Sequence, residues 1–191
     1  IAVFSDDIRD GIKGSVFRHE ENGFASGRPG MEESIKFGIV ASVKHPQVDY
    51  SKVNYSKAPY ANEPSNTITY AECHDNHVLW DKLAISAKDA TEAERKEMHK
   101  LALSIVLTSQ GISFLHAGTE FLRSKKGHEN SYNAGDSINA IDWSLKTKNK
   151  DVFDYVRALI KMRKEHPAFR MKTAKDVASN IHFLSDTNGI D

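Results

Sequence analysis

Three groups of polar and charged residues each follow a short apolar run that has the composition of a buried strand. The three polar groups are residues 5–10, 72–77 and 116–120. The carboxyl ends of parallel strands meet at one edge of a sheet, and the working residues of many α/β enzymes lie there. We therefore expect the three groups to share one rim. Polar residues are common in any loop after a strand, so a single group would carry little weight.

The middle group allows two kinds of chemistry. It contains four residues whose side chains can bind zinc, namely Cys73, His74, Asp75 and His77. Successive strand residues point to opposite faces, and the sequence has neither a second cysteine nor an H-E-x-x-H helix to complete the set, so we expect no metal. The second interpretation takes His74 and Asp75 as a pair aimed into a cleft. There a fixed carboxylate stabilises positive charge and an imidazole hydrogen-bonds a hydroxyl.

The elements that must position these groups form a repeating pattern. The apolar runs are 1–4, 67–71 and 112–115, and the helical periods are 31–43, 91–110 and 151–165. Thr91 and Glu94 form a capping box at the start of the second helix. The segments 46–66 and 119–148 are expected to be loops. Three successive βα units predict an α/β fold, with either a parallel sheet or part of a (β/α)8 barrel, since a complete barrel needs about 250 residues.

Composition and charge exclude several classes of protein. The 191 residues include 26 basic and 26 acidic side chains, so no general field gathers nucleic acid or anionic lipid. No apolar run approaches the roughly 20 residues that cross a bilayer. We therefore expect neither nucleic acid nor membrane as a partner. The single cysteine excludes an internal disulfide and is compatible with a secreted or a cytoplasmic protein.

Both ends of the sequence have the character of interior segments. Residues 1–4 are already strand-like, and residues 181–184 lead into the turn signal Asn188-Gly189 with two residues left to return. We interpret the chain as a piece of a longer protein.

Four stretches in order carry a resemblance that covers essentially the whole chain. They are FSDDIRDGIKGSVF (4–17), YAECHDNHVLWDKL (70–83), QGISFLHAGTE (110–120) and NSYNAGDSINAIDW (130–143). They resemble, respectively, the regions of the sixth, seventh and eighth barrel strands and the following substrate-side loop of type I pullulanases. These enzymes belong to glycoside hydrolase family 13, the α-amylase superfamily.

The resemblance implies a fold and a set of roles. Residues 1–170 would be the C-terminal portion of a (β/α)8 TIM barrel, strands 6–8, and residues 171–191 the start of an antiparallel β-sandwich domain. Asp75 would be the carboxylate that stabilises the transition state. The substrate-binding residues would be His74, Asn76, Tyr132, Asn133 and Asp136. His116 and Glu120 are expected to be structural, and the charged residues 6–10 to order their own loop.

The resemblance also implies an activity for the longer protein, namely hydrolysis of α-1,6-glucosidic bonds in pullulan and branched maltooligosaccharides. The nucleophile and the acid/base of the family follow the fourth and fifth strands, upstream of the matched region, so we expect the isolated chain to be inactive. No cofactor is implied, and calcium in the parent enzyme stays open. The alternative is a non-catalytic α/β module that binds carbohydrate or a partner chain. Because open sheet edges invite pairing, we expect self-association or a complementing N-terminal fragment.

Overall fold

The strands of the molecule form one small parallel sheet. The computed structural model describes residues 1–184 and has three strands in that part, β1 (Val3–Phe4), β2 (Thr67–Thr69) and β3 (Ile112–Ser113), in the order β1-β2-β3. Both pairs are parallel, with Val3 opposite Thr67 and Ile68 opposite Ile112. The strands are shorter than the apolar runs, but their number, order and direction agree with the three predicted βα units.

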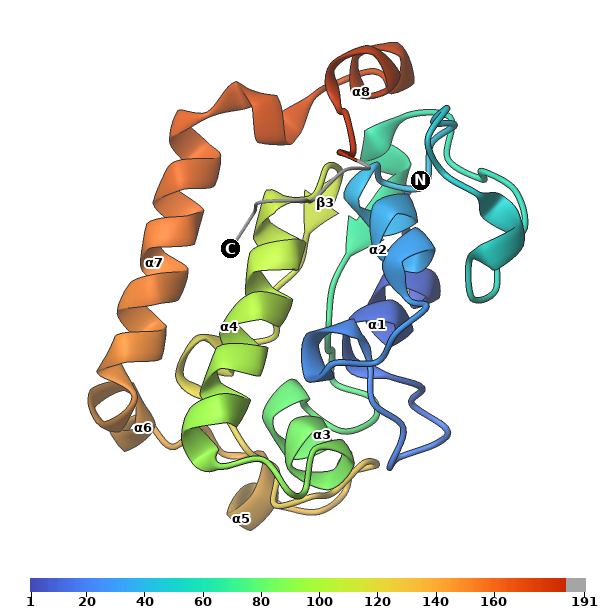
Figure 1. Cartoon of the computed structure of the whole chain (residues 1–191). Helices are drawn as coiled ribbons and strands as arrows, with labels where there is room; N and C mark the ends of the chain where they lie inside the picture. The colour runs from blue at the N-terminus through green and yellow to red at the C-terminus, as the bar shows by residue number, and fades with distance from the viewer. Residues whose placement is uncertain (185–191) are drawn as a thin grey trace.

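Helices make up most of the regular secondary structure (Figure 1). The α-helices are α1 (Asp6–Lys13), α2 (Glu32–Ile39), α3 (Leu79–Ser86), α4 (Glu92–Thr108), α5 (Asp136–Asn139), α6 (Ser144–Lys148), α7 (Lys150–Glu165) and α8 (Ala174–Asn180). Single 3-10 turns lie at η1 (Phe24–Ser26), η2 (Tyr50–Lys52), η3 (Pro64–Asn66), η4 (Thr119–Phe121) and η5 (Pro167–Arg170). The described residues contain no helix long and apolar enough to cross a membrane.

The two longest helices agree with the sequence prediction and lie side by side (Figure 1). The capping box of α4 is formed: the Thr91 hydroxyl accepts from the Glu94 N–H at 3.2 Å, and the Glu94 carboxylate accepts from the Thr91 N–H at 2.7 Å. Arg163 of α7 donates to the carbonyl oxygens of Leu107 and Ser109 at 3.0 and 2.6 Å. These carbonyls lie at the C-terminal end of α4, where no further turn can satisfy them.

Helix α1 occupies a segment that the sequence predicts to be a loop. Its residues Ile8 and Ile12 are fully buried in the main apolar cluster. A Cβ on Gly38 would lie 2.2 Å from the Ile8 Cδ1. Only glycine therefore allows α2 to pack this closely against α1. Helix α3 was likewise not predicted, and the predicted loop 119–148 contains η4, α5 and α6. The predicted loop 46–66 is confirmed as irregular apart from the 3-10 turns η2 and η3.

The C-terminal segment folds back on α2. The prediction of strand character from residue 171 onward is wrong for residues 174–180, which form α8. Val177 is fully buried in a second apolar cluster with Phe37 and Val40, and the His45 ring nitrogen Nε2 lies 3.1 Å from the Ile181 carbonyl oxygen. The predicted turn at 186–189 lies outside the described residues. The domain boundary after residue 170 and the sandwich domain stay predictions.

Candidate functional site

The polar groups that follow β1 and β2 meet at one open cleft of about 690 Å³. The cleft is lined by Asp6, Arg9, Val16, Phe17, His19, Asp75, Asn76, Glu129 and Asn130. Two segments distant in sequence thus meet there because parallel strands send their loops to the same edge. The third group, residues 116–120, approaches the second one behind the cleft, where the His116 Nδ1 lies 3.8 Å from the Glu72 Oε1. The first two groups therefore share a rim as predicted, whereas none of residues 116–120 lines the cleft.

His74 and Asp75 stand side by side on this rim. The His74 Nε2 lies 3.4 Å from the Asp75 Oδ2, and the two side chains are 81% and 69% exposed. The next residue, Asn76, has a φ of 64°, in the left-handed region that asparagine tolerates better than most residues. The chain therefore turns sharply just after the pair, which leaves both side chains free to contact a ligand.

A buried carboxylate, that of Glu72, lies two residues before His74. The Glu72 side chain accepts from the Leu79 N–H, and its Oε1 has no hydrogen-bond partner among residues 1–184. Burial raises the pKa of Glu72. Burial, reinforced by the Arg123 charge, lowers the pKa of His116 to about 4. His116 is therefore neutral at neutral pH, and it contacts protein groups, in keeping with the structural role expected for it.

Hydrogen bonds connect the loop between η4 and α5 to the rim. The Lys125 ammonium donates to the His74 carbonyl oxygen at 3.3 Å and to the Ser131 hydroxyl at 2.8 Å. Asp81 of α3 accepts from the Lys125 N–H at 2.8 Å and the Gly127 N–H at 3.0 Å. Buried charged side chains therefore position the segment that contains the predicted sugar-binding residues.

The charged residues of α1 form the ordering network that was expected. Arg9 donates to Asp6 at 2.7 Å and to Asp10 at 2.6 Å. The Asp7 carboxylate accepts the backbone N–H groups of residues 55 and 56 at 2.8 and 3.2 Å. Each of these acids is already engaged in holding the long loop 46–66 or the start of α1.

The other predicted binding residues lie on the surface, farther along the chain. Tyr132 and Asn133 are exposed, and Asp136 begins α5. Asp136 lines a separate hollow of about 330 Å³. Within residues 1–184 no hydrogen bond or ion pair joins Tyr132, Asn133 or Asp136 to His74 or Asp75. Their role as sugar contacts stays a prediction.

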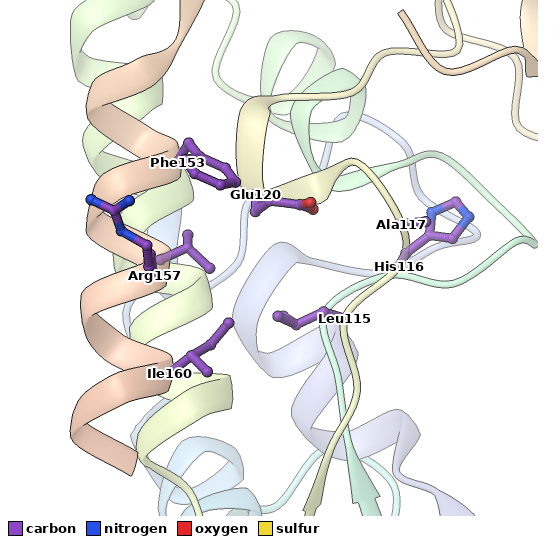
Figure 2. Close-up of a pocket in the computed structure, with 8 residues that line it drawn as sticks. Leu115, His116, Ala117, Glu120, Phe153, Arg157 and Ile160 are labelled. Carbon is purple, nitrogen blue, oxygen red and sulfur yellow. The ribbon is translucent and has the colours of Figure 1, made fainter. Parts of the chain in front are cut away.

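An apolar cavity of about 320 Å³ separates the end of β3 from α7 (Figure 2). Leu115, Phe153 and Ile160 contribute its apolar walls, and the Glu120 side chain lies near Phe153. The His116 ring points away from α7, toward Glu72. This cavity therefore opens on the helical side of β3 and is distinct from the cleft that holds Asp75.

The zinc set considered from the sequence does not assemble. The Cys73 Sγ lies 3.9 Å from the backbone oxygen of Asp75 and is not turned to its carboxylate. In the part of the chain that the structure describes, the one group of three metal-ligating side chains is His19, His77 and Glu129, of which the sequence prediction had considered only His77. The spacing of residues in the sequence did not indicate that His19 or Glu129 would join a group of metal-ligating side chains. Glu72 belongs to the predicted polar group 72–77, whereas Lys125 was missed as a partner of the rim.

Comparison with known proteins identifies relatives over nearly the whole chain. No family model matches. Pullulanase from Bacillus subtilis is 37% identical over 185 residues, which cover 97% of this chain and 24% of that protein. The crystal structure of the Paenibacillus barengoltzii pullulanase in complex with maltohexaose and α-cyclodextrin matches with a TM-score of 0.89 and 43% identity, over 97% of this chain and 28% of the other. Pullulanase from Bacillus acidopullulyticus matches with a TM-score of 0.87 and 45% identity, over 97% of this chain and 21% of the other.

The chain thus spans about a quarter of the length of the relatives that it matches. One of these relatives is a type I pullulanase from Bacillus subtilis in complex with maltose, at 37% identity and a TM-score of 0.89. The resemblance inferred from the four sequence motifs is confirmed: over nearly all of its length, this chain is related in sequence and in structure to a segment of the type I pullulanases.

Proposed function

We propose that this chain is part of a glycosidase that hydrolyses α-1,6-glucosidic bonds in pullulan and related branched α-glucans. The observation that carries the proposal is the exposed His74–Asp75 pair, 3.4 Å apart at the carboxyl edge of a parallel sheet. The relationship to pullulanases over 97% of the chain supports it.

The three strands would be strands 6–8 of a (β/α)8 barrel. Each strand leads through helices to a parallel neighbour, as barrel strands do. Both edges of the sheet are open within residues 1–184, and Val3, Phe4 and Ile112 on the edge strands are exposed. Further strands on these edges would cover that apolar surface. The start of the sandwich domain beyond residue 170 remains part of the same proposal.

Asp75 would act on the transition state. Cleavage of a glycosidic bond passes through a sugar with oxocarbenium character, and a fixed negative charge beside it is stabilising. His74 and Asn76 would hydrogen-bond ring hydroxyls next to it. Tyr132 would offer a flat apolar face to a sugar ring, while Asn133 and Asp136 would pair with hydroxyls farther along the groove. The α-glucan would be the partner of this surface.

The isolated chain would bind sugar without hydrolysing it. Retaining glycosidases need two carboxyl groups about 5–5.5 Å apart as nucleophile and acid/base. Asp6 lines the cleft, but it is paired with Arg9, and Asp10 is buried and paired with the same arginine. We therefore expect no measurable hydrolysis of pullulan by this chain.

A chimera tests the proposal directly. This chain would replace the matching segment of the Bacillus subtilis pullulanase, and the release of reducing ends from pullulan would be measured. We expect the chimera to be active and its Asp75→Asn variant to lose at least a thousandfold in kcat. Asp89, which is exposed on the loop before α4, provides the matched control Asp89→Asn. A D75N chimera as active as its parent would overturn the role of Asp75.

The open sheet edges favour the second candidate function, a non-catalytic module that pairs with another chain. Light scattering of the chain across a range of concentrations tests whether the edges pair, and the chimera separates the two functions. Self-association would agree with exposed edges in either case, whereas a folded but inactive chimera that still binds maltooligosaccharide would favour the module.

A further inference from the structure

Three metal-ligating side chains from separate segments converge at the cleft, and no role has been given to them above. They are His19 from the loop after α1, His77 from the turn before α3, and Glu129 from the loop before α5. One ligand atom of each lies within 4.8 Å of the others. The His19 Nε2 and the Glu129 Oε2 are 2.7 Å apart, and the two imidazole rings meet edge to face with centroids 4.6 Å apart.

His77 is held in one orientation by its surroundings. Its Nε2 lies 3.0 Å from the Gly127 carbonyl oxygen. A carbonyl only accepts, so Nε2 carries the ring proton and Nδ1 keeps its lone pair. A metal-bound histidine almost always donates its other ring N–H in this way. The backbone of His77 is fixed as well, because the buried Lys13 ammonium donates to its carbonyl oxygen at 3.0 Å.

The other two side chains have room to adjust. Glu129 is exposed and His19 is partly exposed, whereas His77 is 6% exposed. Tetrahedral zinc with bonds of about 2.0–2.2 Å brings its ligand atoms to roughly 3.3 Å from one another. Closing the distances of up to 4.8 Å present here would require His19 and Glu129 to rotate toward the fixed His77.

We propose that His19, His77 and Glu129 bind a divalent transition-metal ion, zinc in particular, with a fourth position left for water. Two histidines and a glutamate are a known ligand set for zinc sites with three protein ligands. Imidazole nitrogen also selects such ions over magnesium or calcium, which prefer oxygen. The site differs from the zinc set considered in the sequence, of which it keeps only His77.

The ion would join two walls of the cleft. His19 and Glu129 line that cleft together with Asp75 and Asn76, and they come from loops 110 positions apart in the chain. A metal bridge would fix the distance between these loops and add positive charge beside the predicted sugar-binding rim. The inference does not depend on glycosidase activity, because binding is measured on the chain itself.

The test is a titration of the 191-residue chain with Co²⁺, followed by its visible absorption, and then displacement by Zn²⁺. We expect one Co²⁺ per chain with the intense absorption of a four-coordinate site. His19→Gln and Glu129→Gln should each weaken binding at least tenfold. Glu20→Gln and His128→Gln, which change the neighbouring residues, should stay within twofold of the parent. His77 is left unchanged because it is buried against Gly127.

Thermal unfolding provides a second readout that does not depend on colour. Zinc should raise the Tm of the parent and of the Glu20 and His128 variants, and EDTA should reverse the rise, while the Tm of the other two variants should not respond. Circular dichroism without metal establishes that all variants keep the helices. Lack of saturable binding by the folded parent, or binding that neither His19→Gln nor Glu129→Gln weakens, would overturn the proposal.

Discussion

The Lys125 ammonium donates to the carbonyl oxygen of His74 across 3.3 Å. This contact links a loop after β3 to the turn after β2, directly beneath the pair that faces solvent. Lys125 is buried, and burial lowers its pKa. A charged group kept in such surroundings must be compensated by its hydrogen bonds, so this one contributes to the geometry of the rim.

Replacing Lys125 with Met should loosen the loop without unfolding the chain. The variant loses the bonds to His74 and Ser131 but keeps the apolar stem. We expect amide hydrogen exchange over residues 127–133 to accelerate about tenfold, equivalent to about 1.4 kcal/mol of local stability. Lys88→Met, at an exposed position, is the control and should leave exchange there unchanged.

Replacing Asp81 with Ala should destabilise the whole fold. Its carboxylate accepts from the Lys125 and Gly127 N–H groups and from the Ser124 hydroxyl, which donates at 2.6 Å. Loss of this acceptor leaves buried donors without a partner, at a cost of about 2–4 kcal/mol in the free energy of unfolding. Urea denaturation measures it, and Asp89→Ala should change the value by less than about 0.5 kcal/mol. Equal effects of the two substitutions would contradict the role given to Asp81.

Arg163 should contribute far more to the free energy of unfolding than Arg157, which lies on the same helix. Arg163 satisfies three carbonyls at and beyond the end of α4, those of Leu107, Ser109 and Gly111. Arg163→Met should cost about 2–4 kcal/mol in denaturant unfolding, because these acceptors become unsatisfied. Arg157 forms an exposed ion pair with Asp154, so Arg157→Met should cost below about 1 kcal/mol.

Mild acid should destabilise the chain through His99. Burial lowers the pKa of His99 to about 4, whereas an unfolded histidine titrates near 6.5. The unfolded state therefore binds the proton first, and the contribution of His99 is complete above pH 6.5 and declines as pH falls toward 4. Between pH 7 and pH 5 the loss amounts to about 2 kcal/mol.

The variant His99→Gln isolates this effect. Glutamine still offers an N–H to the Thr119 carbonyl, which His99 reaches at 2.9 Å, but it does not titrate. Urea midpoints at pH 7 and pH 5 should differ less in the variant than in the parent. His128→Gln changes an exposed ring and should retain the full pH dependence. Parallel pH dependence in all three chains would exclude His99 as a source.

Local signals predicted the helices that have regular apolar spacing and caps. α4 combines both and α7 has the apolar spacing without a side-chain cap, and the two were predicted to within about a turn. α1 was missed because its sequence, DDIRDGIK, is polar and has a central glycine. What stabilises α1 is the burial of Ile8 and Ile12 against α2 and α4, and such tertiary contacts are invisible in a window of eight residues.

The candidate site was likewise predictable only where local sequence signals determine it. The position of Asp75 at the cleft follows from its place after a strand and agrees with the prediction, although the neighbouring His74 does not line the cleft. The approach of Lys125 to His74, or of His19 to Glu129, depends on loops that have no period and whose course is set by buried partners such as Asp81. The C-terminal helix α8 was misread as strand because alternation over a few residues does not distinguish the two.

Two properties of asparagine bear on position 76: its tolerance of a left-handed backbone and its amide, which can contact a ligand. A φ of 64° favours asparagine or glycine whether or not the amide ever meets a sugar. The presence of asparagine after His74-Asp75 is therefore weak evidence for ligand contact. Glycine separates the two demands, since it preserves the turn and removes the amide: a chimera with Asn76→Gly that keeps its affinity for maltooligosaccharide would reveal a residue kept for shape alone.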